Sequence, residues 1–309
     1  MKALVWSIEV ALIIAIILFF YLNTGVKTDK IIYVPKGSIK SIVTHLSKEG
    51  YDVNRFDTFI LRFLGSPQYG WIDLGKEELS KGEFLWLLTR AKAATKSITL
   101  IPGDTTYVAL EKIAARFGLE SEKLWEAYEK RASFPDGVFI PDTYHLPIGF
   151  NEDELIEYLL EFAMNEHKHM AETYQKSYDP VRWFRIITIA SIIEKEAANH
   201  EEMPLVASVI YNRLAKNMRL QMDGTLNYGE FSNQRVTSRR IRQDSSRFNT
   251  YKRRGLPPHP VSIVSNAAIK AALFPTKSNY LYFVKNESGT HTFSESYRSH
   301  LNAIKNGKK

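Results

Sequence analysis

The chain has 309 residues, of which 44% are hydrophobic and 24% are charged. These fractions are ordinary for globular proteins and argue against a chain that is disordered throughout, and the length allows two or three domains. No cysteine is present, which excludes disulfides and thiolate metal sites but leaves the compartment open. The net charge of +7 and the pI near 9.2 fit either an anionic partner or simple solubility.

The N-terminus reads MKALVWSIEVALIIAIILFFYLNTG, and its apolar run from residue 3 to residue 22 contains a single charge, Glu9. About 20 apolar residues are enough to cross a bilayer as a helix. A cleaved signal peptide, the alternative, has a shorter apolar core and a small-residue cleavage site, whereas this run ends in bulky aromatic residues. We therefore predict an uncleaved transmembrane anchor over residues 1–23, a polar linker over 24–30, and an exported body.

The first part of the body is predicted to be a small α+β module over residues 31–96. A β-rich run at 31–34 meets a Pro-Lys-Gly turn, and Ser38 is a plausible cap for a helix that stops at Gly50. A second strand-turn-helix unit follows, with a strand at 98–101 and a helix capped by Thr105 or Thr106. Between the two units, FDTFILRFLGS and SKGEFLWLLTRAK have the apolar spacing of amphipathic helices.

Residues 97–309 are predicted to form a mainly helical domain with a small β portion. Helices are expected at 152–174, 182–199 and 202–217, after the turn-rich connector FIPDTYHLPIG. A proline-rich loop and a short helix follow in KRRGLPPHPVSIVSNAAIKAALFP, and YLYFVKNESGTHTFSE reads as a β-hairpin. The polar, basic segment 231–251 predicts no regular structure. The fold class is therefore α+β.

The stretch IASIIEKEAA, residues 189–198, places glutamates at the end of a strongly apolar helix. Its isoleucines point in all directions, so the helix is predicted to be buried on most sides. At 100° per residue Glu194 shares a face with small residues, Ala190, Ser191 and the alanines at 197 and 198, which let a backbone or a ligand approach. Glu196 points roughly the opposite way, toward solvent or a structural partner.

A carboxyl group in an apolar setting has a raised pKa, because burial disfavours its charged form, and it can then act as a general acid. The alternative for Glu194 is a helix-end glutamate paired with Lys or Arg. Polar and aromatic residues follow the helix in VASVIYNRLAKNMRLQMDGTLNYG and RFNTYKRRGLPPHP, a mixture that suits sugar hydroxyls and sugar rings. Ordinary turn chemistry is the alternative there. The candidate contacts are Asn212, Gln221, Asp223, Thr225, Tyr228, Asn249 and Tyr251.

Six stretches occur in the order found in the YceG-like endolytic murein transglycosylases, which the chain resembles over about residues 31–305. They are FIPDTYHLP, IASIIEKEA, VASVIYNRL, RLQMDGTLNYG, FNTYKRRGLPP and YLYFVKNESGTHTFSE. The module at 31–96 resembles the LysM-type subdomain of that family, and LysM modules bind N-acetylated glycans. The resemblance implies a catalytic domain over residues 97–309, with Glu194 in the position of the family's catalytic glutamate.

The resemblance further implies cleavage of the β-1,4 bond after N-acetylmuramic acid inside peptidoglycan strands. One carboxylate suffices, because the 6-hydroxyl of the muramic acid attacks and leaves a 1,6-anhydro end, so the paired carboxylates of hydrolases are not required. It implies that the enzyme needs no cofactor and no metal. It also implies a single-pass protein of the inner membrane whose catalytic body lies outside the cytoplasm, which limits strand length and associates with peptidoglycan synthases. The family usually has proline at the positions of Gly224 and Arg247 and often glycine at His259, which leaves the shape of those loops open.

Other interpretations remain. A metal site would need His259, His291 and His300 to converge, and their spacing fits no common ligand pattern. His291 is expected to make a structural or site hydrogen bond. The basic runs RVTSRRIRQDSSR and YKRRG suit nucleic acid, but an exported protein meets peptidoglycan and anionic lipid first. A wall-binding scaffold without catalysis is the main alternative function. A partner carboxylate at Asp223 would instead favour hydrolysis.

Overall fold

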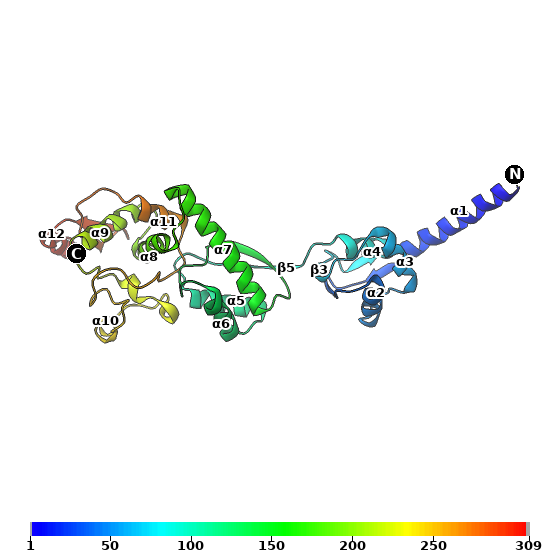
Figure 1. The fold of residues 1–309 in the computed structure, drawn as a ribbon, viewed down its shortest axis with the longest axis horizontal. Coiled ribbons are helices and arrows are strands. Elements are labelled where there is room, and N and C mark those ends of the chain that lie inside the picture. The colour runs from blue at the N-terminus through cyan, green and yellow to red at the C-terminus, as the bar shows by residue number, and fades with distance from the viewer. Residues whose placement is uncertain (1, 307–309) are drawn as a thin grey trace. The chain divides into compact units, whose positions relative to one another are not determined.

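The computed structural model describes residues 2–306 and is a mixed structure of helices and small sheets (Figure 1). The described chain divides into two compact units. The first holds residues 2–96 and 145–149, and the second holds 97–144 and 150–306. The chain thus returns to the first unit for the short stretch 145–149, which the sequence did not predict.

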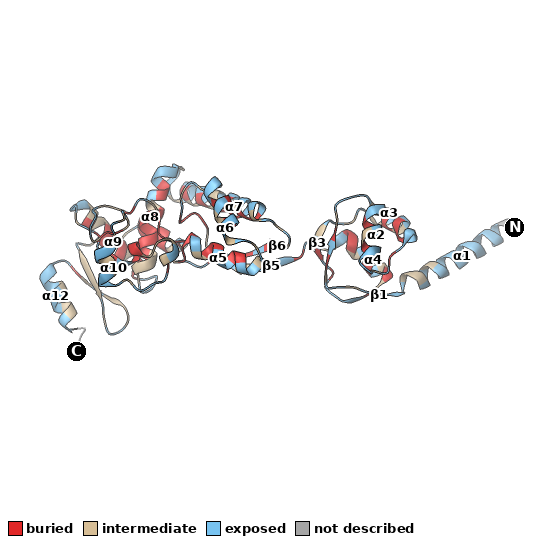
Figure 2. Ribbon diagram, turned by 90° about the horizontal axis from the view of Figure 1, so that it is seen from below, coloured by how far each residue is buried: buried red, intermediate tan, exposed pale blue. Residues whose placement is uncertain are grey.

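The first helix, α1 (Lys2–Leu22), is the apolar segment at the N-terminus. Its stretch Leu4–Leu22 is long and apolar enough to cross a membrane, and none of it is buried inside the structure. Figure 2 shows α1 as an exposed helix apart from its last turn. Exposed side chains such as Phe19 and Phe20 are about two-thirds accessible, which is costly in water and favourable in lipid.

The remainder of the first unit combines two antiparallel strand pairs with three helices. Strand β1 (Gly25–Lys27) pairs with β4 (Glu78–Ser80), and β2 (Ile31–Val34) pairs with β3 (Gly70–Asp73). The helices are α2 (Ile39–Lys48), α3 (Arg55–Leu64) and α4 (Lys81–Arg90). Side chains from every one of these helices and from the paired strands fill one buried core, in which Leu46, Leu61 and Phe84 are inaccessible.

Local capping explains where these three helices begin. Ser38 caps α2 by accepting a hydrogen bond from the Ser41 amide, as the sequence predicted. Asn54 and Ser80 begin α3 and α4 with capping boxes, in which the acidic residue at the third helical position bonds back to the cap amide. Both helices therefore lie where their amphipathic patterns placed them.

The second unit is mainly helical. Strand β5 (Thr95–Thr99), which starts within the first unit, pairs with β6 (Thr143–Pro147), and β7 (Tyr282–Lys285) pairs with β8 (His291–Ser294) in the predicted hairpin. The helices are α5 (Thr106–Phe117), α6 (Ser121–Arg131), α7 (Glu152–Gln175), α8 (Pro180–Glu196), α9 (Met203–Ala215), α10 (Ser238–Gln243), α11 (Asn266–Leu273) and α12 (Tyr297–Asn306). Two short 3-10 helices, η1 (Asp223–Leu226) and η2 (Gly229–Phe231), lie between α9 and α10.

Helix α8 is at the centre of this unit and packs against α9, α11 and η1. Asp179 caps its start and Pro180 is its first residue, a position where proline costs no hydrogen bond. His167 of α7 is fully buried against it, accepting a hydrogen bond from Trp183 Nε1 (3.0 Å) and donating to the Val138 carbonyl (2.8 Å). Burial lowers the pKa of His167 to about 4, so this imidazole is neutral.

Several sequence expectations differ from the structure. The helix predicted to reach Asn199 ends at Glu196, because Ala197 is extended, so the alanines at 197 and 198 are not on the helical face of Glu194. The expected connector around Tyr144 contains strand β6, and the expected strand at 98–101 begins earlier, at Thr95. The segment 231–251, which predicted no structure, contains the short helix α10.

Candidate active site

Glu194 lies in the last turn of α8, where the backbone after the proline-rich loop comes alongside. The Val261 amide donates to Ser191 Oγ (3.0 Å), and the Ser265 amide and hydroxyl both donate to Glu194 Oε2 (2.9 and 2.6 Å). Small side chains on this side of α8 permit that approach, as the sequence predicted. Two donors on one oxygen fix the direction of the carboxyl group.

Ser265 also begins helix α11. Its Oγ accepts a hydrogen bond from the Ala268 amide (3.2 Å), so one hydroxyl both caps a helix and holds Glu194. Within residues 2–306, Glu194 forms no ion pair and its Oε1 has no hydrogen-bond partner. The predicted alternative of a glutamate paired with Lys or Arg is therefore wrong for the described chain, and one oxygen of Glu194 is left for a ligand.

Glu196, two residues further on, is a carboxyl group with a raised pKa. Burial raises the pKa of Glu196 to about 7, and the nearby charge of Asp223 acts in the same direction, against the opposing effects of the Gly224 amide and Arg213. Glu196 Oε1 accepts a hydrogen bond from the Gly224 amide at 2.6 Å. The structural partner expected for Glu196 is therefore the backbone of η1.

Gly224 is required for this close approach. A Cβ atom on residue 224 would lie 2.5 Å from Lys195 Cβ and 3.0 Å from Glu196 Oε1, well inside van der Waals contact. Glycine thus lets η1 pack directly on the end of α8. A proline at this position would also lack the amide that donates to Glu196.

Three of the predicted contact residues form one partly exposed group beside η1. Asp223 Oδ1 accepts a hydrogen bond from the Tyr251 hydroxyl (2.7 Å), and the Gln221 amide donates to the Thr250 carbonyl (3.2 Å). Gln221 is exposed and has a left-handed backbone with φ of 52°, which is uncommon for a residue with a side chain. We call Gln221, Asp223 and Tyr251 the Asp223 group.

Thr225 and Asn249 occupy a different position from the one predicted. Both are fully buried, and Thr225 Oγ1 donates to the Met222 carbonyl at 2.8 Å. The Asn249 amide nitrogen donates to the carbonyls of Ile241 and Asp244, both at 2.8 Å. Their polar atoms therefore hold the loop beneath the Asp223 group together, which corrects the prediction that they face the substrate.

Asn212 and Tyr228 also bond to protein groups. The Asn212 amide nitrogen donates to the carbonyls of Ser278 (2.8 Å) and Tyr280 (2.9 Å), which fastens α9 to the segment before the hairpin. Tyr228 stacks on Phe248 with ring centres 4.2 Å apart and donates its hydroxyl to Asp244 Oδ2. Both residues are half-buried, and their donors are already used inside the protein.

Sequence reasoning missed two ionisable residues near the end of α8, Lys195 and Asp136, whose charges act on each other. Lys195 is half-buried and donates to Ser232 Oγ (3.3 Å), and burial lowers its pKa while the charges of Asp136, Asp104 and Glu194 oppose that shift. Asp136 is buried and accepts bonds from the amides of Thr106 (3.0 Å) and Gly137 (2.9 Å). Burial raises the pKa of Asp136 to about 7. Lys195 belongs to the Glu-Lys-Glu motif, but nothing in the sequence around Asp136 indicated its burial.

The three histidines considered as metal ligands have separate partners. His291 bonds to Glu202 through its amide (2.6 Å) and its Nδ1 (2.8 Å), which confirms the expected structural hydrogen bond. His259 Nδ1 contacts the Pro260 carbonyl, and His300 stacks on Tyr282. Within residues 2–306 there is no group of three or more His, Asp or Glu side chains that could hold a metal ion.

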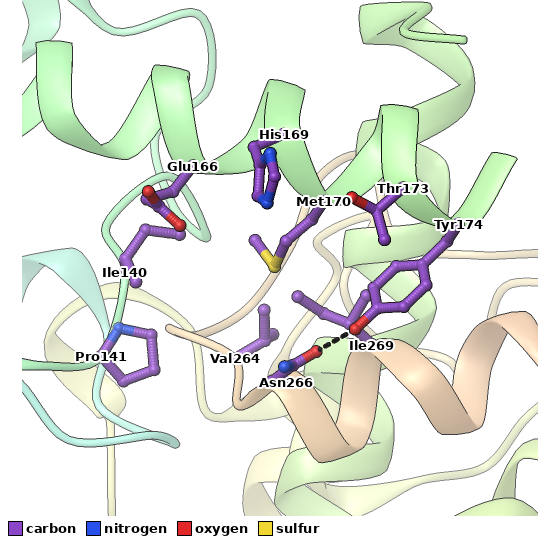
Figure 3. Close-up of a pocket in the computed structure, with 10 residues that line it drawn as sticks. All are labelled: Ile140, Pro141, Glu166, His169, Met170, Thr173, Tyr174, Val264, Asn266 and Ile269. Atoms are coloured by element: carbon purple, nitrogen blue, oxygen red, sulfur yellow. Dashed lines mark hydrogen bonds between the residues drawn. The ribbon is translucent and has the colours of Figure 1, made fainter. Parts of the chain in front are cut away.

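A cavity of about 300 Å³ lies beside the segment that carries Ser265 (Figure 3). Val264 and Asn266, the neighbours of Ser265, form part of its wall, and Asn266 accepts a hydrogen bond from the Tyr174 hydroxyl of α7 (3.0 Å). Met170 and Ile269 are among its apolar residues, and Glu166 and His169 line its α7 side. The contact with α7 supports the segment that positions Glu194.

The chain is similar to known proteins over almost all of its length after the N-terminal helix. A family model described as YceG-like matches residues 32–306. An endolytic murein transglycosylase of Bacillus subtilis (strain 168) is 28% identical over 313 residues, covering 90% of this chain and 84% of that protein. A protein of the same name from Streptococcus pneumoniae (strain R6) is 34% identical over 154 residues, which are 48% of this chain and 28% of that one. The 2.6 Å crystal structure of a yceG-like protein from Listeria monocytogenes aligns with a TM-score of 0.56 and 25% identity, covering 89% of this chain and 99% of that one.

Proposed function

Because the chain belongs to the YceG-like family, we propose that it is a lytic transglycosylase that cuts inside peptidoglycan strands, at the β-1,4 bond between N-acetylmuramic acid and N-acetylglucosamine. The names of the relatives from two genera support the substrate and the reaction. The single observation that carries the assignment of the site is the geometry of the Glu194 carboxyl group. Ser265 fixes one of its oxygens, and the other has no hydrogen-bond partner within residues 2–306.

In the proposed reaction Glu194 acts first as an acid and then as a base. Its carboxylic acid form gives a proton to the glycosidic oxygen as the bond from that oxygen to C1 of the muramic acid breaks. The 6-hydroxyl of the same sugar forms a new bond to C1 and passes its proton to the Glu194 carboxylate. The acid is regenerated, no water is consumed, and the new end is a 1,6-anhydro sugar.

The Asp223 group, which lies next to Glu196 at the end of α8, is the proposed place for sugar contacts. Gln221 is exposed, and within residues 2–306 its side chain has no hydrogen-bond partner, so its amide is available for sugar hydroxyls. Asp223 keeps an oxygen beyond the one that Tyr251 occupies. Thr225 and Asn249, buried below, would act by holding this group in place.

Helix α1 is proposed to anchor the enzyme in the cytoplasmic membrane with its body outside the cytoplasm. Its length and composition support this, since about 20 apolar residues span the hydrocarbon core. Residues 31–96 are proposed to be a LysM-like module that binds glycan. An enzyme tethered in this way reaches newly made strands first, so it would limit strand length, in association with peptidoglycan synthases.

The full chain in detergent micelles, Glu194→Gln and Glu196→Gln test the proposal on uncrosslinked peptidoglycan strands, with products identified by mass spectrometry. We expect anhydro-ended fragments from the native chain and from Glu196→Gln, and none from Glu194→Gln. Fragments heavier by one water would indicate a hydrolase and point to Asp223. If the folded native chain binds peptidoglycan strands but does not cleave them, the protein is a wall-binding scaffold. Cleavage by Glu194→Gln but not by Glu196→Gln would move the acid to Glu196.

A further inference from the structure

Helix α3 presents a row of exposed phenylalanines. Phe56, Phe59 and Phe63 are 49%, 57% and 93% accessible, whereas Thr58 and Leu61 on the other side are buried in the module. Their spacing of three and four residues places the rings along one side of the helix. Single exposed apolar residues are normal on a protein surface, but three large rings together mark an interaction site.

This row lies next to the end of the apolar helix α1, and Figure 1 shows α3 close to that end. The Tyr21 hydroxyl, in the last turn of α1, donates to Asp57 Oδ1 (2.8 Å) and accepts a bond from the Asn54 amide nitrogen (2.9 Å). The rings of Tyr21 and Phe56 meet edge to face at 5.2 Å. Helix α3 is therefore fastened to α1 at the point where the apolar segment Leu4–Leu22 ends.

The remaining exposed residues of α3 suit a membrane surface. Arg55 and Arg62 flank the phenylalanines, and the Arg62 guanidinium lies 5.6 Å from the centre of the Phe59 ring. Helices that lie in the interface of a bilayer combine aromatic residues on one side with Lys or Arg, which meet anionic headgroups. Aromatic side chains are also enriched at the level where a membrane span leaves the hydrocarbon.

We propose that α3 lies in the headgroup region of the bilayer that α1 crosses, with Phe56, Phe59 and Phe63 inserted toward the acyl chains. This inference rests on the proposed membrane anchor. The occupant is lipid because the row is continuous with α1, and any bilayer around α1 ends within reach of Tyr21 and Phe56. The predicted linker over 24–30 contains strand β1, which pairs with β4, so the module follows α1 without a free linker. A second contact of this kind holds the first unit against the membrane.

The chain contains no cysteine, so single spin labels can be placed without background. Phe63→Cys, Phe20→Cys and Thr44→Cys would be labelled in the full chain, reconstituted in vesicles of phosphatidylcholine and phosphatidylglycerol. Phe20 reports on α1, and Thr44 is an exposed control on the polar side of α2. Collision of each label with oxygen, which dissolves in lipid, is compared with collision with a water-soluble nickel complex.

We expect labels at 20 and 63 to favour oxygen and the label at 44 to favour nickel. If the label at 20 favours oxygen and the label at 63 behaves like that at 44, the anchor stands and the proposal for α3 is overturned. If the label at 20 also favours nickel, the anchor itself fails, and α3 with it. Phe63 is almost fully exposed, so its replacement removes little packing, and an unchanged thermal transition confirms the fold.

Glycan is the other ligand that exposed aromatic rings could bind, and soluble peptidoglycan fragments test for it. If the fragments immobilise the label at 63 and exclude both relaxation agents, the phenylalanine row binds glycan and the lipid proposal is wrong. If the label at 63 keeps its preference for oxygen in their presence, lipid is the occupant. The double variant Phe59→Ser/Phe63→Ser should then lower the oxygen preference of a label at Arg62→Cys on the same helix.

Discussion

Replacing Ser265 with alanine removes one hydroxyl that forms two separate hydrogen bonds. The hydroxyl donates to Glu194 Oε2 at 2.6 Å, and it accepts the bond from the Ala268 amide that caps α11. The Ser265 amide remains as a second donor to Glu194. Ser265→Ala therefore loosens the carboxyl group without leaving it unsupported. Ser265 is a positioning residue in this reasoning, since it acts on the sugar only through Glu194.

The magnitudes differ for stability and for rate. Loss of an N-cap costs about 1 kcal/mol of unfolding free energy, within a range of about 0.5–2 kcal/mol. A hydrogen bond to a charged group contributes about 1.5–3 kcal/mol. If that contribution is fully used in orienting Glu194, the cleavage rate falls roughly 10- to 150-fold, because each ~1.4 kcal/mol is a factor of ten. The rate loss is thus the larger and more specific effect.

The assay is the initial rate of anhydro-end formation, paired with denaturant unfolding of each variant. Ser265→Thr keeps a hydroxyl and a good cap, so it should recover most of the rate. Ser38→Ala is the matched control, since Ser38 caps α2 by accepting from the Ser41 amide at the same 3.2 Å and does not contact Glu194. A native rate in Ser265→Ala, or an equal rate loss in Ser38→Ala, would refute the orientation of Glu194 by Ser265.

Three further variants probe groups at the end of α8 and the buried Asp136. Asp136→Asn should flatten the pH dependence of the unfolding free energy relative to the native chain. The pKa of Asp136 is about 7 in the folded chain against an ordinary value of 3.8, so the native chain loses stability as the pH rises from about 4 to 7, by about 4 kcal/mol at 1.36 kcal/mol per unit. Glu196→Gln should act in the same direction between about pH 4.5 and 7, and an unchanged pH slope would contradict the burial of this carboxyl group. Gly224→Ala should cost about 1–3 kcal/mol by overpacking against Lys195, measured by denaturant unfolding, whereas Gly25→Ala, where a Cβ meets nothing within 4 Å, should not destabilise.

The elements of this protein could be predicted wherever local chemistry decides them. Ser38 and Thr105 cap α2 and α5 because a hydroxyl before an amphipathic run is sufficient to satisfy the first free amides. Helix α8 could be predicted from its apolar residues, but its end could not. Ala197 leaves the helix although alanine favours helices, because the following chain turns toward α9 instead of continuing.

The roles of the polar residues after α8 depend on contacts far along the chain. Thr225 and Asn249 have the side chains of sugar-binding residues, yet these side chains already form hydrogen bonds with carbonyl and hydroxyl groups of their own loop. A long irregular segment cannot pair its backbone groups in a helix or sheet, so buried side chains must do it. Composition alone does not distinguish a side chain that faces a ligand from one that replaces a missing backbone hydrogen bond.

The Glu-Lys-Glu end of α8 shows why one glutamate of the two suits catalysis. Consecutive helical residues are rotated by about 100°, so Glu194, Lys195 and Glu196 meet three different segments of the chain. They bond to Ser265, Ser232 and Gly224, respectively. Three loops are thus fixed to the rigid end of one buried helix, which is the kind of support that a precise site requires. Glu196 is bonded to η1, whereas Glu194 is held by one oxygen, and within residues 2–306 the other oxygen is left for the proton that the proposed reaction moves.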